Sequence, residues 1–373
     1  MSRPTVLLGM SGGVDSSVAA LLLTRQGYEV HGVTLQVWEH ESEEVAASKR
    51  WEERGCCKVG IARYVAQKLA IPHELVDSRE QFRTAVIDDF VAAYASGTTP
   101  NPCVRCNERV KIRQLIELAD AKGIAFVATG HYARTERVGD QPVLKKGADL
   151  HKDQSYFLYR LQVPWLSRLL FPVGHMQKSD VWKEAESLGL PADEMRESQE
   201  ICFVSHGDYR TFLKDQPALP ATPGLFIDET GAPLGTHQGI PFYTPGQRRG
   251  LGVATGERLY VQRVEAATNI VVLGPEESLL SSTCTVSDLN ILDRRLLTER
   301  TLAGCKVRYA TPPAQATTTP NTTESLMVEF HTPQRALSPG QSAVFYDGDR
   351  VLGGGIIDTF ETKSSPKTSP STS

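Results

Sequence analysis

The chain has 373 residues, which at roughly 150 residues per domain predicts two or three domains. Hydrophobic residues make up 40% and charged residues 23%, a balance typical of a globular protein that can bury a core. Lys and Arg number 40 against 44 Asp and Glu, so the net charge of −4 excludes nucleic-acid binding through bulk charge but not through a local basic face. We find no apolar run near the ~20 residues of a membrane span and no secretory signal in MSRPTVLLGM, and we expect a cytoplasmic protein.

Strand and helix patterns alternate over residues 1–208. Short apolar runs predict strands, and apolar residues at helical spacing predict helices between them. The expected strands are 5–10, 29–37, 73–77 and 124–129, and the expected helices are 16–26, 58–70, 80–94, 110–121 and 178–188. Such alternation is typical of βαβ units, so we predict an α/β fold with a parallel sheet over residues 1–208.

The pattern changes after residue 208, where prolines and glycines crowd the sequence. Short β-rich runs separated by turn residues then follow to residue 359, with a hairpin signal at Asp347-Gly348. Residues 311–323 are expected to form a polar loop, and the acidic stretch 39–53 a solvated excursion. We predict a small central domain over 209–280, an all-β barrel over 281–362 and a disordered tail over 363–373.

The segment from Gly9 to Ser17 (GMSGGVDSS) follows an expected strand and opens an expected helix. Its two adjacent glycines permit a tight turn, and its serine hydroxyls and helix N–H groups suit a phosphate. It lacks the lysine of the G-x-x-x-x-G-K-[ST] loop, and it is not G-x-G-x-x-G. The string resembles the PP-loop, S-G-G-x-D-S, of ATP pyrophosphatases, which cleave ATP between the α and β phosphates. That resemblance implies a site for ATP and Mg²⁺ formed by Gly9, Met10, Ser11, Gly12, Gly13, Val14, Asp15 and Ser16.

Further nucleotide contacts are expected at the carboxyl edge of the sheet, where ligands of open α/β sheets bind. Gly130 follows the expected strand 124–129 and falls at this edge. The PP-loop resemblance places Leu35, near the end of the second strand, beside the adenine. It also implies that Asp15 helps to place Mg²⁺.

Seven cysteines in a chain of this length, without a secretory signal, argue against a disulfide scaffold. Cys103 and Cys106 form a C-x-x-C in a segment that Pro100 and Pro102 predict to be a rigid loop, before the helix expected at 110–121. Cys202 lies in SQEICF. A cysteine alone is more often a small buried apolar residue. A zinc site at Cys103 and Cys106 would need two more ligands, and the sequence has no second C-x-x-C or H-x₃-H. Cys56 and Cys57 could in principle supply them, but adjacent ligands are geometrically awkward. Zinc is thus the competing interpretation of this C-x-x-C, and we predict no metal site.

The motifs together, in their order along the chain, resemble the tRNA-specific 2-thiouridylase family. They are the PP-loop, TPNPCVRCN at 99–107, ATGHYA at 128–133, KDQSYFL at 152–158, SQEICF at 198–203, GQRRGLG at 246–252 and SPGQSA at 338–343. The resemblance implies ATP-dependent thiolation of C2 of the wobble uridine, U34, in tRNAs for Lys, Glu and Gln. Adenylation of the C2 oxygen, with release of pyrophosphate, makes AMP the leaving group.

The same resemblance assigns the thiols and the tRNA contacts. It implies that Cys202 carries a persulfide received from a cysteine desulfurase or sulfur-relay donor, and that Cys106 is the second, nucleophilic thiol, paired with it in a disulfide. The implied tRNA contacts are Asn101, Pro102, Cys103, His131, Lys152, Asp153, Gln154, Arg308, Tyr309 and Gln341. Many relatives have Asp where this chain has Cys103. An iron–sulfur cluster held by Cys103, Cys106 and Cys202 is therefore the alternative route for sulfur.

Local charge explains how a chain of net charge −4 could bind RNA. Residues 103–113, 244–263 and 293–308 each carry a net charge of +3 by sequence and have tyrosines nearby or among them. Any one such segment is commonly just solvated surface. Two other functions stay open, a small-molecule PP-loop ligase and a nucleotide-binding module without catalysis, and neither needs Cys106 or Cys202. We expect neither DNA nor a membrane as a partner.

Overall fold

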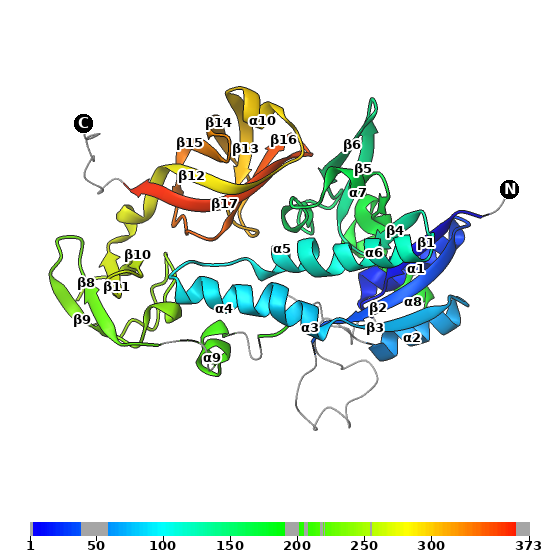
Figure 1. The fold of residues 1–373 in the computed structure, drawn as a ribbon, viewed down its shortest axis with the longest axis horizontal. Helices are drawn as coiled ribbons and strands as arrows, with labels where there is room; N and C mark the ends of the chain where they lie inside the picture. The colour runs from blue at the N-terminus through cyan, green and yellow to red at the C-terminus, as the bar shows by residue number, and fades with distance from the viewer. Residues whose placement is uncertain are drawn as a thin grey trace. The chain divides into compact units, whose positions relative to one another are not determined.

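The computed structural model describes residues 3–38, 59–190, 201–204, 208–216, 219, 221–253 and 256–362. They belong to two compact units (Figure 1). The first unit draws on 1–88, 102–208 and 349–351, and the second on 89–101, 209–348 and 352–373. The chain therefore passes between units more often than a simple succession of domains would require. The expected acidic excursion 39–53 and the expected tail 363–373 lie outside the described residues.

A five-stranded parallel sheet forms the centre of the first unit, in the order β3-β2-β1-β4-β7. Its strands are β1 (Thr5–Gly9), β2 (Glu29–Gln36), β3 (His73–Asp77), β4 (Phe126–Thr129) and β7 (Leu169–Leu170). The predicted α/β fold with a parallel sheet is confirmed. The strand β7 was not predicted, because two residues give no period to read.

Helices cover both faces of this sheet. Alternate residues of β1 point to opposite faces, so the contacts of successive residues show which helices lie on each side. Val6 and Leu8 pack in one core with residues of α1 (Val14–Arg25), α2 (Val59–Lys68) and α8 (Lys178–Ser187). Gly9 faces the other side, where a Cβ would lie 2.9 Å from Leu115 Cδ1 of α6 (Ile112–Ala121). Gly27, with φ +86°, follows the C-cap of α1, directly after the end expected for the helix 16–26.

Two long helical runs contain π-helical turns. The first joins α3 (Arg79–Phe82), η2 (Arg83–Ile87) and α4 (Asp88–Ala95), and the second joins α5 (Pro102–Cys106), η3 (Asn107–Lys111) and α6. The helix expected over 110–121 therefore begins eight residues earlier than predicted. Proline suits the first helical turn because its missing N–H has no acceptor there in any case. The C-x-x-C consequently lies on a helix rather than in a loop.

The remaining elements of the first unit connect β4 to α8. They are β5 (Ala133–Val138), β6 (Gln141–Lys146), η4 (Ser155–Phe157), α7 (Val163–Leu166) and η5 (Pro172–His175). β5 and β6 pair as an antiparallel hairpin that the sequence analysis did not identify.

A four-stranded sheet in the order β10-β11-β8-β9 lies in the second unit. Its strands are β8 (Gly224–Ile227), β9 (Pro233–His237), β10 (Tyr260–Glu265) and β11 (Ile270–Gly274), with α9 (Tyr209–Lys214) and the short helices η7 (Ile240–Phe242) and η8 (Glu276–Leu279) nearby in sequence. β10 and β11, two of the short β-rich runs expected after residue 208, pair antiparallel. Aromatic rings of Phe226, His237 and Tyr243 pack together within this part.

Six antiparallel strands close into a barrel in the order β12-β15-β14-β13-β16-β17, and β12 pairs back with β17. They are β12 (Leu280–Ile291), β13 (Thr301–Lys306), β14 (Ala314–Thr322), β15 (Ser325–Arg335), β16 (Ser342–Asp347) and β17 (Arg350–Thr362). The predicted barrel is confirmed. The expected loop 311–323 is wrong, because its threonines are β-branched and form β14, with Ala316 and Thr318 buried.

The barrel core is apolar and includes two cysteines, Cys284 and Cys305. Both are free thiols and nearly inaccessible to solvent. Burial raises the pKa of the Cys284 thiol to about 12, and burial also raises that of Cys305.

Candidate active site

The loop between β1 and α1 is held by its own serine hydroxyls. Ser16 Oγ and Ser17 Oγ donate to the carbonyl of Gly13 at 3.0 and 2.9 Å, and Ser11 Oγ lies 3.2 Å from Ser16 Oγ. Gly12 has φ +76°, a conformation that glycine adopts without steric cost. The Ser17 N–H bonds the Gly13 carbonyl at 3.1 Å, so the N–H groups of the preceding turn have no acceptor within the helix. The loop thus offers helix N-terminal donors, which suit a phosphate.

Gly130 lets the end of β4 approach this loop closely. A Cβ at this position would lie 2.6 Å from Ser16 N and 2.7 Å from the carbonyl carbon of Asp15. Because β1 and β4 are parallel neighbours, their carboxyl ends lie at one edge of the sheet. The structure therefore places Gly130 beside the PP-loop.

Met10 and Leu35, both predicted nucleotide contacts, are buried. The Met10 N–H donates to the Val33 carbonyl at 2.7 Å, and its carbonyl accepts from Thr34 Oγ1 at 2.6 Å. Met10 therefore fastens the start of the loop to β2. Leu35 lies near the carboxyl end of β2, at the same edge of the sheet as the loop.

The carboxylate of Asp15 is held through one oxygen. Tyr132 Oη donates to Asp15 Oδ1 at 2.8 Å, and Lys178 Nζ donates to the same atom at 2.6 Å. Lys178 is 8% exposed, and its Nζ lies 5.4 and 5.0 Å from the ring centroids of Tyr132 and Trp182. Lys178 was not predicted as a site residue. Its only signal was that a helix begins there, 163 residues from Asp15.

Cys103 and Cys106 lie three residues apart on α5, so their side chains share one face of the helix. Cys106 is buried and Cys103 is partly exposed. The protein around the Cys103 sulfur displaces water and so raises the pKa of its thiol, while the nearby Lys111 ammonium opposes this rise. The π-turn η3 follows Cys106 directly, and such turns are frequent at functional sites.

Cys202 is positioned by its neighbour, Phe203, which is almost fully buried. The Phe203 ring contacts Phe82 with centroids 5.7 Å apart and Trp38 with centroids 6.3 Å apart, both edge-on. Trp38 follows the end of β2, and Phe82 lies in α3, which follows β3. Cys202 is therefore anchored at the carboxyl edge of the sheet that also carries the PP-loop. Ser198, Gln199 and Glu200 of its motif lie outside the described residues.

The KDQSYF motif contacts the C-x-x-C helix through η4, which packs against α5. Asp153 is buried, and its carboxylate accepts from the N–H groups of Gly147 and Ser155, both at 3.0 Å, and from Ser155 Oγ at 2.9 Å. Gln154 Oε1 accepts from the Tyr132 N–H at 2.9 Å. The acidic and amide side chains of the motif thus shape its own loop. Lys152 is partly exposed.

His131 is a neutral imidazole near pH 7. Burial, assisted by the Lys111 ammonium, lowers its pKa from 6.5 to about 3. Its Nδ1 lies 2.8 Å from Thr129 Oγ1, and its ring meets Phe171 edge-on. Because it carries no charge, His131 can offer a hydrogen bond or a ring face to a base rather than an ion pair to a phosphate.

The second unit gathers predicted tRNA contacts from distant parts of the chain. Gln341 Nε2 donates to the Pro100 carbonyl at 3.4 Å, next to Asn101. The Thr99 N–H donates to the Pro339 carbonyl at 2.7 Å, and Gly340 packs against the Thr99 backbone. Arg308 Nη2 donates to the Ala336 carbonyl at 2.6 Å, within the same turn region. The structure thus brings the TPNP and SPGQ segments together. Tyr309 is exposed.

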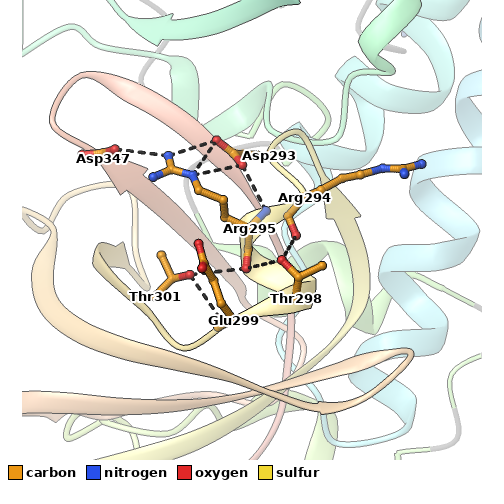
Figure 2. A network of polar contacts seen from close by, with 7 residues as sticks. All are labelled: Asp293, Arg294, Arg295, Thr298, Glu299, Thr301 and Asp347. Atoms are coloured by element: carbon orange, nitrogen blue, oxygen red, sulfur yellow. Dashed lines mark hydrogen bonds and ion pairs between the residues drawn. The ribbon is translucent and has the colours of Figure 1, made fainter.

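The charge expected for residues 293–308 is partly neutralised (Figure 2). Arg295 Nη2 lies 3.0 Å from Asp293 Oδ2 and 3.3 Å from Asp347 Oδ2, and Asp347 comes from outside the segment. Arg300 lies 3.7 Å from the carboxylate of Glu329, again from outside it. These contacts fix the short helix α10 (Arg295–Thr298), while the Arg294 side chain extends away from the network. The net charge of +3 counted by sequence therefore overstates the positive charge here.

The described residues, from Arg3 to Thr362 with their gaps, contain no group of three or more His, Cys, Asp or Glu side chains suited to a metal ion. Cys103, Cys106 and Cys202 are all described, and they form no such group. Cys106 and Cys202 are both free thiols. Over the same residues, no helix is both long and apolar enough to cross a membrane.

Family models match nearly all of the chain. A tRNA methyl transferase HUP domain matches residues 4–206, a tRNA methyl transferase PRC-barrel domain 210–275, and an aminomethyltransferase beta-barrel domain 281–357. The tRNA-specific 2-thiouridylase MnmA of Magnetococcus marinus is 45% identical over 362 residues, covering 96% of this chain and 100% of that protein. This chain belongs to the tRNA-specific 2-thiouridylase family.

Other members of the 2-thiouridylase family also match this chain along nearly its whole length. The protein of that name from Heliobacterium modesticaldum is 45% identical and covers 95% of this chain and 92% of its own length. Among solved structures, a 4-thiouridine synthetase in complex with RNA and ATP is 16% identical with a TM-score of 0.34, covering 57% of this chain and 50% of that one. That likeness is too low to support an argument, so the 2-thiouridylase assignment depends on sequence.

Proposed function

We propose that this chain catalyses the ATP-dependent 2-thiolation of U34 in tRNAs for Lys, Glu and Gln, in the cytoplasm. The proposal is supported by membership of the 2-thiouridylase family along nearly the whole chain. The observation that supports it best is that two groups needed for the reaction lie at the same edge of the same sheet. The helix N-terminal donors of the PP-loop and the anchored Cys202 both belong to the carboxyl edge of β1, β2 and β3.

The chemistry requires a leaving group on C2 of uracil, because a carbonyl oxygen leaves poorly. ATP is the co-substrate: the C2 oxygen attacks its α-phosphorus, pyrophosphate leaves, and C2 becomes bonded to an adenylate. The PP-loop N–H groups would bind the departing pyrophosphate, and Asp15 would help to hold Mg²⁺. Gly9, Met10, Val14, Leu35 and Gly130 would shape the nucleotide site around them.

Sulfur then replaces oxygen. The terminal sulfur of a Cys202 persulfide attacks C2, and AMP leaves with the original oxygen. The Cys106 thiolate attacks Sγ of Cys202, which forms a Cys106–Cys202 disulfide and releases the 2-thiouridine. An external dithiol must reduce this disulfide, and a cysteine desulfurase or relay protein must supply the next persulfide sulfur.

The base has to leave its stack to reach ATP, as it does in other base-modifying enzymes. Neutral His131 would contact the extruded base, and Asn101, Pro102 and Cys103 would flank it. Lys152, the loop held by Asp153 and Gln154, and the second-unit residues Arg308, Tyr309 and Gln341 would hold the surrounding RNA.

An iron–sulfur route would need Cys103, Cys106 and Cys202 to bind one cluster. These cysteines form no metal-binding group in the structure, so we route no step through a cluster. The persulfide route needs Cys106 and Cys202 but not Cys103. A Cys103→Ser variant therefore separates the two routes.

The test is an anaerobic assay with ATP, Mg²⁺, a persulfide source and unmodified tRNA-Glu, read by nuclease digestion and mass spectrometry of U34. We expect an ATP-dependent exchange of oxygen for sulfur in the wild type and in Cys103→Ser, and none in Cys202→Ala. Cys305→Ala, which removes a barrel thiol, is the matched control and should keep activity. Loss of thiolation in Cys103→Ser together with loss of bound iron would replace the persulfide route with the cluster. A wild type that forms AMP but no thiouridine would point to a small-molecule ligase instead.

A further inference from the structure

The two donors to Asp15 both bind Oδ1. Tyr132 Oη and Lys178 Nζ reach this atom from two separate segments of the chain, and among the described residues the hydrogen bonds to the Asp15 carboxylate both end on Oδ1. Two bonds to one oxygen restrict rotation of the carboxylate about its Cβ–Cγ bond. The direction in which Oδ2 points is therefore set by the protein.

Contacts of both its backbone and its side chain hold Lys178 next to Asp15. Its backbone N–H donates to Asp149 Oδ2 at 3.0 Å, and its Nζ lies close to the rings of both Tyr132 and Trp182. A buried ammonium is costly unless it is paired, and Asp15 supplies the partner. Lys183 on the same helix is different: it is 74% exposed and pairs with Asp180 at 2.8 Å. Exposed pairs of that kind contribute little to stability.

We propose that Lys178 and Tyr132 are positioning residues that fix Asp15 so that its Oδ2 faces the divalent cation of bound Mg·ATP. This inference rests on the proposed function and adds two residues to its ATP site. Carboxylate oxygens are ligands that Mg²⁺ prefers, and ligating carboxylates are commonly oriented by hydrogen bonds from outer residues. Asp15 is the second residue of α1, beside the N–H groups that suit phosphate.

Charge balance is consistent with this arrangement. An ammonium and Mg²⁺ near one carboxylate repel each other, but the polyphosphate of ATP brings enough negative charge for both. The PP-loop itself contains no lysine, and Lys178 is a cation from elsewhere in the chain that contacts it through Asp15. If Lys178 instead contacted the phosphates directly, its loss would weaken nucleotide binding with or without the metal. The experiment below distinguishes these two roles.

The experiment uses the full-length protein with Mn²⁺ as the probe for Mg²⁺ and α,β-methylene-ATP as the nucleotide. Bound Mn²⁺ is measured by electron paramagnetic resonance at saturating nucleotide, and nucleotide affinity is measured by calorimetry in EDTA. The variants are Lys178→Met, which keeps an unbranched stem without charge, Tyr132→Phe, which keeps the ring, and Lys178→Arg. Lys183→Met on the same helix is the matched control.

We expect Lys178→Met and Tyr132→Phe to weaken Mn²⁺ binding by about 10- to 100-fold, the usual effect of losing an outer partner of a metal ligand. Nucleotide affinity in EDTA should stay within about twofold, Lys178→Arg should recover part of the Mn²⁺ affinity, and Lys183→Met should match the wild type. If Lys178→Met does not fold, as judged by thermal unfolding, Tyr132→Phe decides the question.

Three results would overturn the inference. An equal loss of nucleotide affinity with Mn²⁺ and in EDTA would make Lys178 a phosphate contact. Unchanged Mn²⁺ affinity in both variants would make the contact with Asp15 purely structural. A wild type that binds no nucleotide under either condition would overturn the proposed function, and this inference with it.

Discussion

Replacing Gly130 with alanine should damage the ATP site directly. The added Cβ would lie 2.6 Å from Ser16 N and 2.7 Å from the carbonyl carbon of Asp15, whereas ordinary contacts begin at 3.4 Å. The end of β4 and the first turn of α1 must therefore separate by about 0.8 Å. Both sides are backbone atoms, so no side chain can rotate away. Overpacking of this kind costs about 1–3 kcal/mol of stability, and a shift of ~1 Å in a reacting group can cost about 100-fold in rate.

The assay is thermal unfolding with and without α,β-methylene-ATP, followed by thiolation of tRNA. Gly130→Ala should melt several degrees lower, lose most of the stabilisation by nucleotide and thiolate about 100-fold more slowly. Gly304→Ala in the barrel is the matched control, since its Cβ would come no nearer than 3.2 Å to a side-chain atom, Pro313 Cβ, and would lie 3.8 Å or more from Tyr346. The reasoning is refuted if Gly130→Ala keeps the wild-type melting temperature and binds the nucleotide within twofold.

Two further predictions concern residues assigned to RNA contact. Asp153→Asn should destabilise the protein by about 1–3 kcal/mol in denaturant unfolding, because three internal donors lose a charged acceptor; an unchanged midpoint would contradict this role. His131 should make the free energy of unfolding decrease as the pH is lowered. In the unfolded chain His131 gains a proton below about pH 6.5, but in the folded protein it does so only near pH 3. Between pH 6.5 and 5 this loss should approach about 1.4 kcal/mol per pH unit, and His131→Asn should show a shallower slope in the same unfolding measurement. Identical slopes would show that His131 titrates normally in the folded state.

The sequence predicted the parallel sheet well, because its strands are short apolar runs separated by helices of regular spacing. It also located the turn that the PP-loop requires, since glycines, serines and an acidic residue between a strand and a helix form a local pattern. Gly130 could be placed from topology alone, because the carboxyl ends of parallel strands share an edge.

Contacts between distant residues could not be predicted. The ion pair from Lys178 to Asp15 and the packing of Phe203 on Trp38 and Phe82 depend on how separate βαβ units come together. The start of α5 was missed because two prolines were interpreted only as a rigid loop, although proline also suits a first helical turn. The strand β14 was missed because threonine is polar, while its β-branched side chain favours a strand.

The closed barrel also determines where sulfur can react. Of the five cysteines in the part of the chain that the structure describes, Cys284 and Cys305 lie inside the barrel. A thiol with a pKa of about 12 is ionised in only about one molecule in 10⁵ at pH 7, and only the thiolate attacks a persulfide. A donor that delivers reactive sulfur would therefore leave these two cysteines unmodified. Burial thus limits unwanted persulfidation without requiring the barrel to exclude cysteine from its sequence.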